Sequence, residues 1–192
     1  RTADGASLLL AGVCGELGVT SVLTTEVANW CRSAVREFDI ARRVIQFAIE
    51  NGTIAKHISS SLVMLRDPKR KELGETPLTE LASHLKDPNY RIFAERGQLH
   101  VMNRDGYWRG DDAFEVFDQL AQKNTKLSAS HAFYLGYEMA KAMTALTLGK
   151  QYQQDEALHW GLLTRPEASA LDRRHRAIQS DRSVAPDVGD AS

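Results

Sequence analysis

The spacing of apolar and polar positions predicts a helix, a strand and a second helix over the first fifty residues. Residues 8–14 are apolar on nearly every side, which is typical of a buried helix, and Gly18 suits the position just after its end. Residues 19–25 form a short run rich in β-branched side chains, so we expect a buried strand there. The second helix is predicted from about residue 29 or 33 to Glu50.

The strand predicted over 19–25 needs neighbours. A buried strand must pair its backbone N–H and C=O groups with those of adjacent strands. The sequence begins Arg1-Thr2, without a methionine. We interpret residues 1–53 as the closing part of a larger α/β fold whose other strands belong to a segment outside this chain, and we expect the chain to be the C-terminal part of a longer protein.

Residues 54–163 are predicted to form an α+β extension of that fold, mostly helical and with one small antiparallel hairpin. A helix is expected to open at Thr76, which suits the N-cap position because a proline follows it. Residues 90–95 and 98–104 alternate apolar and polar side chains across Arg96-Gly97, which is typical of a hairpin turn.

Two further helices are predicted after the hairpin. One begins at Asp111-Asp112, and a longer one runs from about residue 128 to 148, where Gly149 closes it. The side chains of the longer helix that we expect in the core are Leu135, Met139, Ala142 and Leu146. Residues 164–192 are polar and lack periodicity, so we expect a disordered tail.

The composition excludes several classes of protein. The 192 residues include 24 Lys and Arg against 25 Asp and Glu, so the net charge of −1 gives no basic surface for nucleic acid or an anionic membrane. No apolar run approaches the roughly 18 residues that span a bilayer. Cys14 and Cys31 are too few for a disulfide scaffold and suit a reducing compartment. We therefore expect a cytoplasmic protein without nucleic-acid or membrane partners.

The end of the predicted strand and the start of the next helix carry a candidate substrate- and anion-binding site. Its residues are Thr24, Thr25, Glu26, Arg32, Ser33 and Arg36. Ligands of α/β folds sit beyond the carboxyl ends of strands, where guanidinium groups and free helix N–H groups suit a phosphate or carboxylate. The alternative is a solvated helix face, because Arg32, Arg36, Asp39 and Arg43 share one side and Asp39 can pair with Arg36 and Arg43.

A second candidate set lies on the longest predicted helix. His131, Tyr134 and Glu138 share one side of it. The alternative is structural, with His131 helping to cap the helix start while Tyr134 and Glu138 bond to a neighbouring segment. The histidine and glutamate do not have the spacing of a helical zinc site, so we predict no metal site. His100 is expected on the less buried face of its strand, and the spacing identifies no catalytic residue.

Long stretches of the sequence resemble one known family. They are 16–27 (ELGVTSVLTTEV), 32–39 (RSAVREFD), 62–68 (LVMLRDP), 86–92 (KDPNYRI), 100–106 (HVMNRDG), 131–138 (HAFYLGYE) and 149–155 (GKQYQQD). From about residue 3 to residue 163, the chain resembles the C-terminal part of the dihydropteroate synthase-related proteins that are associated with tetrahydromethanopterin biosynthesis.

The resemblance implies that a pterin-binding (β/α)8 barrel, a TIM barrel, precedes this chain and that residues 6–52 supply its closing helix, strand and helix. In dihydropteroate synthases the last strand ends in a basic Arg-x-His that holds an anionic leaving group. Here the strand ends at Thr24-Thr25-Glu26, and the arginines follow at Arg32 and Arg36. The resemblance places the magnesium and pterin-ring residues on earlier strands, so Mg²⁺ is implied with ligands outside this chain and no cofactor is expected within it.

The function that the resemblance implies is that of a transferase in one-carbon metabolism. It would join a dihydropterin pyrophosphate to an arylamine in the biosynthesis of a folate-type or tetrahydromethanopterin-type cofactor, and we expect the isolated chain to be inactive. The expected partners are the pterin and arylamine substrates, with a homodimer as a candidate assembly. The alternative is a non-catalytic pterin- or nucleotide-binding module whose C-terminal extension binds a partner, which the Thr24-Thr25-Glu26 strand end favours.

Overall fold

The structure, a computed structural model, describes residues 3–54, 58–59, 62–168 and 172, and these form two compact units. The first unit contains the described residues up to 71 together with 148–151 and 159–164. The second contains 72–147, 152–158 and the described residues from 165 onward. Each unit is described by itself.

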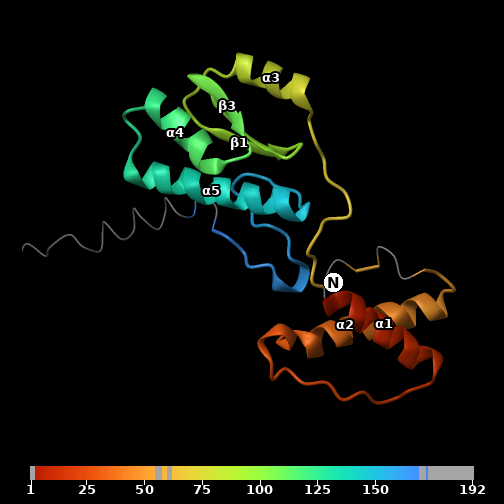
Figure 1. The fold of residues 1–192 in the computed structure, drawn as a ribbon. Helices are drawn as coiled ribbons and strands as arrows, with labels where there is room; N and C mark the ends of the chain where they lie inside the picture. The colour runs from red at the N-terminus through yellow and green to blue at the C-terminus, as the bar shows by residue number, and fades with distance from the viewer. Residues whose placement is uncertain (1–2, 55–57, 60–61, 169–171, 173–192) are drawn as a thin grey trace, which may run out of the picture. The chain divides into compact units, whose positions relative to one another are not determined.

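In the first unit two helices pack against each other (Figure 1). They are α1 (Ala3–Glu16) and α2 (Ala34–Glu50), and a short 3-10 turn (Asn29–Cys31) precedes α2. Both predicted helices are therefore confirmed. The helices approach closely because α1 presents glycine to α2: a Cβ atom on Gly15 would lie 3.2 Å from Ile49 Cδ1. The expectation that α1 is buried all round is wrong, since Leu9 is 70% exposed.

The strand predicted over 19–25 is absent from the structure. These residues have no regular secondary structure, and the Leu23 side chain is 94% exposed. The described strands pair only with one another, in a sheet of three, so residues 19–25 have no strand to pair with. An extended segment without a partner forms no ladder of hydrogen bonds, however strong its β propensity. Whether this segment closes a barrel stays a prediction, as does the domain boundary at residue 53.

The second unit is a small sheet with helices on both faces (Figure 1). Its elements are α3 (Glu75–His84), β1 (Arg91–Glu95), β2 (Gln98–Asn103), β3 (Gly106–Gly110), α4 (Ala113–Lys123) and α5 (Ala129–Leu148), and a 3-10 turn (Gly161–Leu163) follows in the first unit. The sheet is antiparallel in the order β1-β2-β3, with α3 on one side and α4 and α5 on the other. Because β2 is the central strand and both faces are covered, most of its side chains are buried.

The hairpin predicted across Arg96-Gly97 is confirmed. Arg96 has φ = 51° and Gly97 has φ = 79°, and two left-handed residues are what a tight two-residue hairpin turn requires. The third strand, β3, was not predicted, because the five residues 106–110 begin and end with glycine. The N-cap of α3 is Gly74 and not Thr76, so that prediction is wrong by two residues.

The core predicted for the longest helix is confirmed in the main. Leu135, Met139 and Ala142 are no more than 2% exposed, and Leu146 is half-buried. The prediction of a helix after Asp111-Asp112 is also confirmed, because the Asp112 carboxylate accepts hydrogen bonds from two N–H groups of the first turn of α4. The predicted tail over 164–192 falls mainly on 169–171 and 173–192, which lie outside the described residues.

Candidate functional site

The predicted anion-binding residues gather at the amino-terminal end of α2, but a side chain of the protein already binds an N–H group of the first helical turn. Glu26 Oε1 accepts a hydrogen bond of 3.1 Å from the N–H of Val35, in the first turn of α2. Ser33, the N-cap residue, donates its hydroxyl to the Glu37 carboxylate, which is 1% exposed. A carboxylate in the first turn is the natural partner of the positive helix end. Glu26 therefore takes one of the donors that the sequence assigned to an anion.

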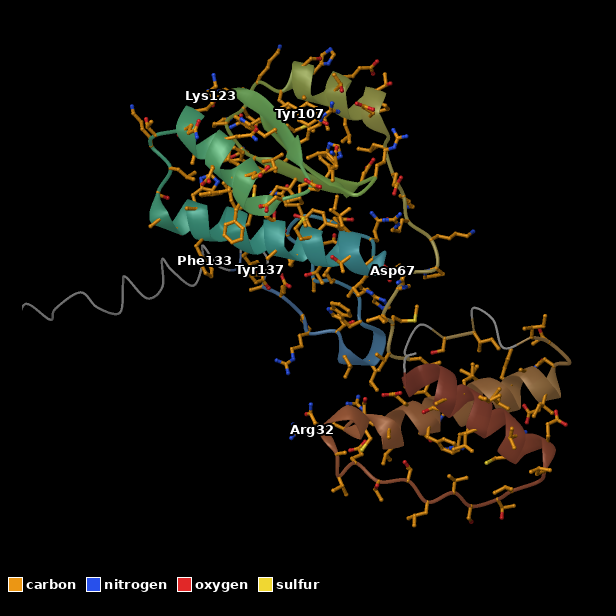
Figure 2. The ribbon with its side chains drawn as sticks, viewed as in Figure 1. Arg32, Asp67, Tyr107, Lys123, Phe133 and Tyr137 are labelled. Carbon is orange, nitrogen blue, oxygen red and sulfur yellow. The ribbon has the colours of Figure 1, made fainter. Side chains whose placement is uncertain are left out.

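The two predicted arginines lie at this end with their charges unpaired. Arg32 (Figure 2) and Arg36 are both exposed. Among the described residues neither of them makes an ion pair. Thr24 is half-buried and Thr25 exposed, in the segment that lacks secondary structure. The structure thus places two free guanidinium groups near a carboxylate-capped helix start.

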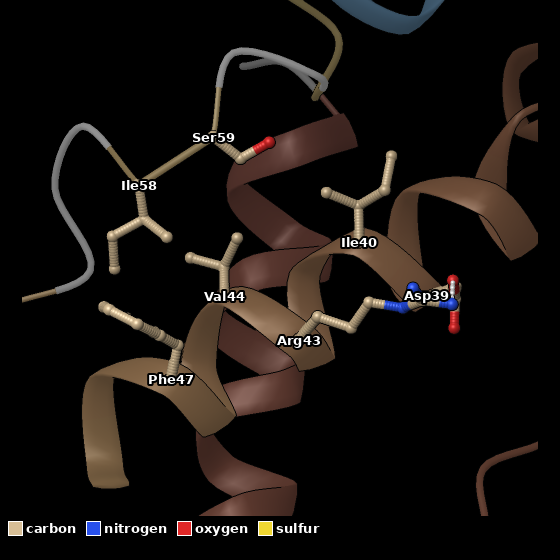
Figure 3. A pocket seen from close by; sticks show the side chains of 7 residues that line it. All are labelled: Asp39, Ile40, Arg43, Val44, Phe47, Ile58 and Ser59. Atoms are coloured by element: carbon tan, nitrogen blue, oxygen red, sulfur yellow. Dashed lines mark ion pairs between the residues drawn. The ribbon is translucent and has the colours of Figure 1, made fainter. Parts of the chain in front are cut away.

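The next turn of α2 shows the alternative arrangement. Asp39 pairs with Arg43 at 2.8 Å and with Arg42 at 2.6 Å, which confirms the predicted Asp39–Arg43 pair but not an Arg36–Asp39 pair. The hydrogen bond from Arg42 lowers the pKa of Asp39. Beside this ion pair lies a cavity of about 400 Å³, in which Ile58 faces Val44 and Phe47 (Figure 3). This part of the helix is a solvated ion-pair face, as the alternative holds.

The second candidate set bonds across to the segment at 152–155. The Tyr134 hydroxyl donates to Asp155 Oδ1 at 3.1 Å, and Glu138 Oε2 accepts from the Tyr152 hydroxyl at 2.8 Å. His131 packs its ring edge-on against Tyr90, 5.6 Å between centroids. The structural alternative for Tyr134 and Glu138 is therefore confirmed. The helix start is capped by the Ser128 hydroxyl, which accepts the N–H of His131, and not by the His131 side chain.

Burial fixes the protonation of both phenols in this set. Desolvation raises the pKa of Tyr134 to about 12, although a hydrogen bond from Gln154 opposes it. Desolvation and the adjacent Glu138 carboxylate raise the pKa of Tyr152 still further. Both hydroxyls are therefore held as hydrogen-bond donors, and neither is suited to act as a general base near neutral pH.

Lys141 is a buried cation that the sequence analysis missed. Its Nζ lies 2.9 Å from Glu138 Oε1, 2.9 Å from Glu167 Oε2 and 2.9 Å from the main-chain oxygen of Glu156. Burial lowers the pKa of Lys141, but the hydrogen bonds that its ammonium donates to Glu167 and Glu138 outweigh this and hold that pKa above its usual value. A lysine kept charged by two carboxylates is a structural cation and not a nucleophile.

Gln154 closes the free edge of the sheet. Its side-chain oxygen accepts the N–H of Ile92 at 2.9 Å, and its Nε2 donates to the main-chain oxygen of Tyr90 at 3.0 Å. This amide supplies the two bonds that a further strand would supply at that point of β1. Covering an edge in this way removes a template for pairing with another chain.

In the first unit a second buried lysine holds the turn at 64–68. Lys150 is 2% exposed; its Nζ donates to the main-chain oxygen of Met64 at 2.9 Å, pairs with Asp67 at 3.3 Å and lies 4.6 Å from the Trp160 ring centroid. The other Asp67 oxygen accepts the N–H of Gln151 at 2.7 Å. This cluster could not be predicted from the sequence, because Lys150 and Gln151 lie more than 80 residues from Met64 and Asp67 along the chain.

The second unit contains a polar cavity on its sheet that the sequence analysis did not foresee. The cavity measures about 320 Å³ and is lined by Glu75, Leu78, Arg96, Gln98, His100 and Arg109. Arg109 pairs with Glu75 at 2.6 Å, and Arg96 lies 3.9 Å from the same carboxylate.

His100 lies on the less buried face of the sheet, as expected, because its cross-strand neighbours there are Phe93, half-buried, and Arg109, exposed. The buried residues Ile92, Val101 and Trp108 lie on the opposite face. The ring of His100 is nevertheless deeply placed, since the residue is only 4% exposed. The β3 strand, which was not predicted, places Tyr107 beside the ring, and the Tyr107 hydroxyl lies 2.7 Å from His100 Nδ1. Nε2 has no hydrogen-bond partner among the described residues. Burial lowers the pKa of His100, and the backbone and carboxylate of Glu95 offset this in part.

The described part of the chain contains neither a metal-binding cluster nor a helix that could span a membrane. There, no group of three His, Cys, Asp or Glu side chains is placed to hold a metal ion. None of its helices combines the length and the apolar character that a membrane span needs.

Two comparisons with known proteins give matches. Residues 78–155 match the family model described as PterinBD-DUF4346, a name that denotes a pterin-binding-related domain. The chain is also similar to the uncharacterized protein MJ0107 of Methanocaldococcus jannaschii, with 25% identity over an alignment of 169 positions. The alignment covers 79% of this chain and 32% of that protein. The chain therefore spans about a third of the length of this relative. No solved structure matches the chain significantly.

Proposed function

We propose that this chain is part of a dihydropteroate synthase-like transferase that joins a dihydropterin pyrophosphate to an arylamine. The observation that carries the proposal is the match of residues 78–155 to a pterin-binding-related family. In the reaction, the amine nitrogen attacks the methylene carbon of the pterin, the carbon–oxygen bond to pyrophosphate breaks, and pyrophosphate leaves with the bonding electrons. The amine nitrogen then loses a proton. A tetrahydromethanopterin-type product, a cytoplasmic location and a homodimer belong to the same proposal.

The role that we propose for this chain is to stabilise the pyrophosphate as it leaves. Arg32, just before α2, and Arg36, in its first turn, are both exposed and without an ion pair among the described residues. Each guanidinium that reaches the anion would add a charge-assisted hydrogen bond of about 1.5–3 kcal/mol, less where solvent screens it. Because Glu26 takes the N–H of Val35, the anion would be held by guanidinium groups more than by the helix terminus.

Pyrophosphate titration tests this role. The 192-residue chain, wild type and Arg32→Ala/Arg36→Ala, is titrated with pyrophosphate in a calorimeter, and the double substitution is expected to weaken binding at least about tenfold. The matched control is Arg43→Ala. Arg43 lies two turns further along α2 and is paired with Asp39, so this substitution should change the pyrophosphate affinity little. Equal affinity of all three proteins would remove the anion site from the proposal.

The second candidate function is a non-catalytic pterin- or nucleotide-binding module with a partner-binding extension. The position of Glu26 favours it, since a carboxylate at the start of α2 repels the anion that a transferase must hold. The substitution Glu26→Gln separates the two candidates. In the transferase it should strengthen pyrophosphate binding several-fold, because a repulsion is removed while an acceptor for Val35 stays. In the non-catalytic module pyrophosphate binding should be absent with either side chain.

The Mg²⁺ implied by the resemblance enters no step of this account. The resemblance assigns its ligands to strands outside this chain, and the described residues hold no cluster suited to it. The assay for turnover therefore uses the longer protein that contains the proposed barrel, with formation of the pterin–arylamine product as the readout. Pterin binding without product would favour the second candidate.

A further inference from the structure

The cavity on the second unit combines groups that recognise an anion with groups that recognise an apolar body. Arg96 lies in the turn between β1 and β2, and Arg109 lies on β3. Both guanidinium groups approach the carboxylate of Glu75. Leu78, 1% exposed, and the ring of His100 supply less polar surface in the same cavity. A cavity of about 320 Å³ is at the lower end of the size range for small-molecule sites.

The charged side chains that line the cavity have a net charge of one positive unit. Arg96 and Arg109 each carry a positive charge, Glu75 a negative one, and burial keeps the His100 ring neutral by lowering its pKa. Glu95 is not among the lining residues, and its carboxylate accepts the N–H groups of Leu73 and Gly74 at 2.8 and 2.9 Å, which commits it to the segment that leads into α3. One singly charged ligand would neutralise this lining.

Glu75 indicates which anion these arginines accept. Its carboxylate sits 2.6 Å from Arg109 Nη1, and it is 56% exposed, so it is held at the mouth of the cavity. It accepts from only some of the N–H donors of the two guanidinium groups, and the other donors remain available. A second carboxylate can share them or displace Glu75, whose side chain is free to rotate into water.

The His100 ring is an independent sign that the cavity is incomplete. The imidazole is more than nine-tenths buried, and Nε2 has no hydrogen-bond partner among the described residues. A buried polar atom without a partner costs free energy that a bound group can recover. The exposed side chains of Arg96 and Gln98 line the same cavity and change rotamer readily, which opens a path toward the ring.

We propose that this cavity binds a small organic monocarboxylate, whose carboxylate contacts Arg96 and Arg109 and whose apolar body lies over Leu78 and His100. The site is separate from the pyrophosphate site at α2 and does not rest on the proposed transferase function. Phosphate esters are disfavoured, because a second negative charge exceeds the single positive excess of the lining.

Titration of the 192-residue chain with three probes tests the proposal. Benzoate is expected to shift the nuclear magnetic resonance signals of the His100 ring saturably. Benzamide, which has the same shape and no charge, and phenyl phosphate, which has a second charge, should each bind at least about tenfold more weakly. Arg109→Gln should weaken benzoate binding by a similar factor. Arg104→Gln is the matched control, since Arg104 is an exposed arginine paired with Asp105 away from the cavity lining.

A gain of binding makes the test independent of damage to the fold. Glu75→Gln removes the internal competitor and leaves two unpaired arginines, so benzoate should bind several-fold more tightly to it than to wild type. The proposal is overturned if Glu75→Gln leaves benzoate affinity unchanged, if benzamide binds as well as benzoate, or if Arg109→Gln and Arg104→Gln have equal effects. Tighter binding of phenyl phosphate than of benzoate would overturn the assignment of a monocarboxylate.

Discussion

Replacement of Lys141 by methionine should destabilise the second unit strongly, because it leaves a buried carboxylate without a counter-charge. Glu138 is 0% exposed and faces Lys141 Nζ at 2.9 Å. Without that cation, the Glu138 carboxylate keeps the Tyr152 hydroxyl at 2.8 Å and the N–H of Asp155 at 3.4 Å, but no counter-charge among these contacts. Methionine fills much of the space of the lysine stem, so the substitution removes the charge and little of the packing.

The magnitude follows from the burial of the two carboxylates that Lys141 contacts. Leaving one charge of a buried pair unpaired costs about 3–5 kcal/mol. Glu167 is 20% exposed and can turn toward water, so the loss concerns Glu138 and should lie near 3 kcal/mol. Glu138→Gln should cost about 1.5–3 kcal/mol, since its amide still accepts from Tyr152 and Lys141 still has Glu167. The double variant should cost less than the sum of the two by about 1 kcal/mol or more, which is the coupling of the pair.

Equilibrium unfolding in urea, followed by circular dichroism, measures these differences in the 192-residue chain. Hydrogen exchange of the β2 amides assigns the loss to the second unit. The matched control is Lys123→Met, the same substitution at an exposed lysine of α4 (Figure 2), which should change the free energy of unfolding by less than about 0.5 kcal/mol. If Lys141→Met cost no more than the control, or if the two substitutions were additive, the buried network would not stabilise this unit as argued.

Three further outcomes are expected. Gly161→Ala should lower the free energy of unfolding by more than about 2 kcal/mol in the same urea experiment, because φ is 59° and a Cβ atom would lie 1.6 Å from Leu62 O; a midpoint equal to wild type would contradict this. Tyr134 should ionise at about pH 12 in an absorbance titration, and stability should fall as pH rises from about 10, where the unfolded phenol ionises, toward that value. The His100 ring should protonate below its usual pKa of 6.5 in a resonance titration, and stability should decline as pH falls through that value, because the unfolded chain takes up the proton first; a pKa at or above 6.5 would show the ring to be better solvated than its burial indicates.

Local signals predicted the helices and the hairpin well. The carboxylate of Asp112 caps α4 as its position before an amphipathic run predicts, and the Arg96-Gly97 pair adopts the left-handed turn that joins β1 and β2. The helix cap and the hairpin turn depend only on residues that are close to each other in the sequence. The anion-site residues could likewise be placed near the start of α2 from sequence, but the hydrogen bond from Val35 to Glu26, nine residues away, could not.

Features that depend on distant partners escaped prediction. Residues 19–25 have strand propensity, but no strand in the described part of the chain pairs with them, and propensity alone does not satisfy the hydrogen bonds of a backbone. The depth at which His100 is buried was not predictable, because β3, the strand that pairs beside it, lies between two glycines and shows no clear strand pattern of its own. The partners of Lys150 are 83 to 86 residues away in the sequence, and no periodicity reports such a pair.

The segment at 149–155 shows how partnering separates structural from functional side chains. It belongs to the resemblance as much as the start of α2 does, yet Lys150, Tyr152, Gln154 and Asp155 each have a defined partner within their own unit. A group whose hydrogen bonds are committed to the fold reaches a ligand only by breaking them, and a buried group pays the full cost of desolvation when it does.

Side chains whose charge or hydrogen-bonding atoms are not used by the fold can bind a ligand without this cost. Arg32 and Arg36 in the first unit have charges without an ion pair among the described residues, and His100 in the second has a ring nitrogen without a hydrogen bond. Chemistry is therefore to be sought at these three side chains before it is sought in the segment at 149–155, although the resemblance includes that segment as well. The two proposed sites follow from this ordering and not from the similarity of sequence alone.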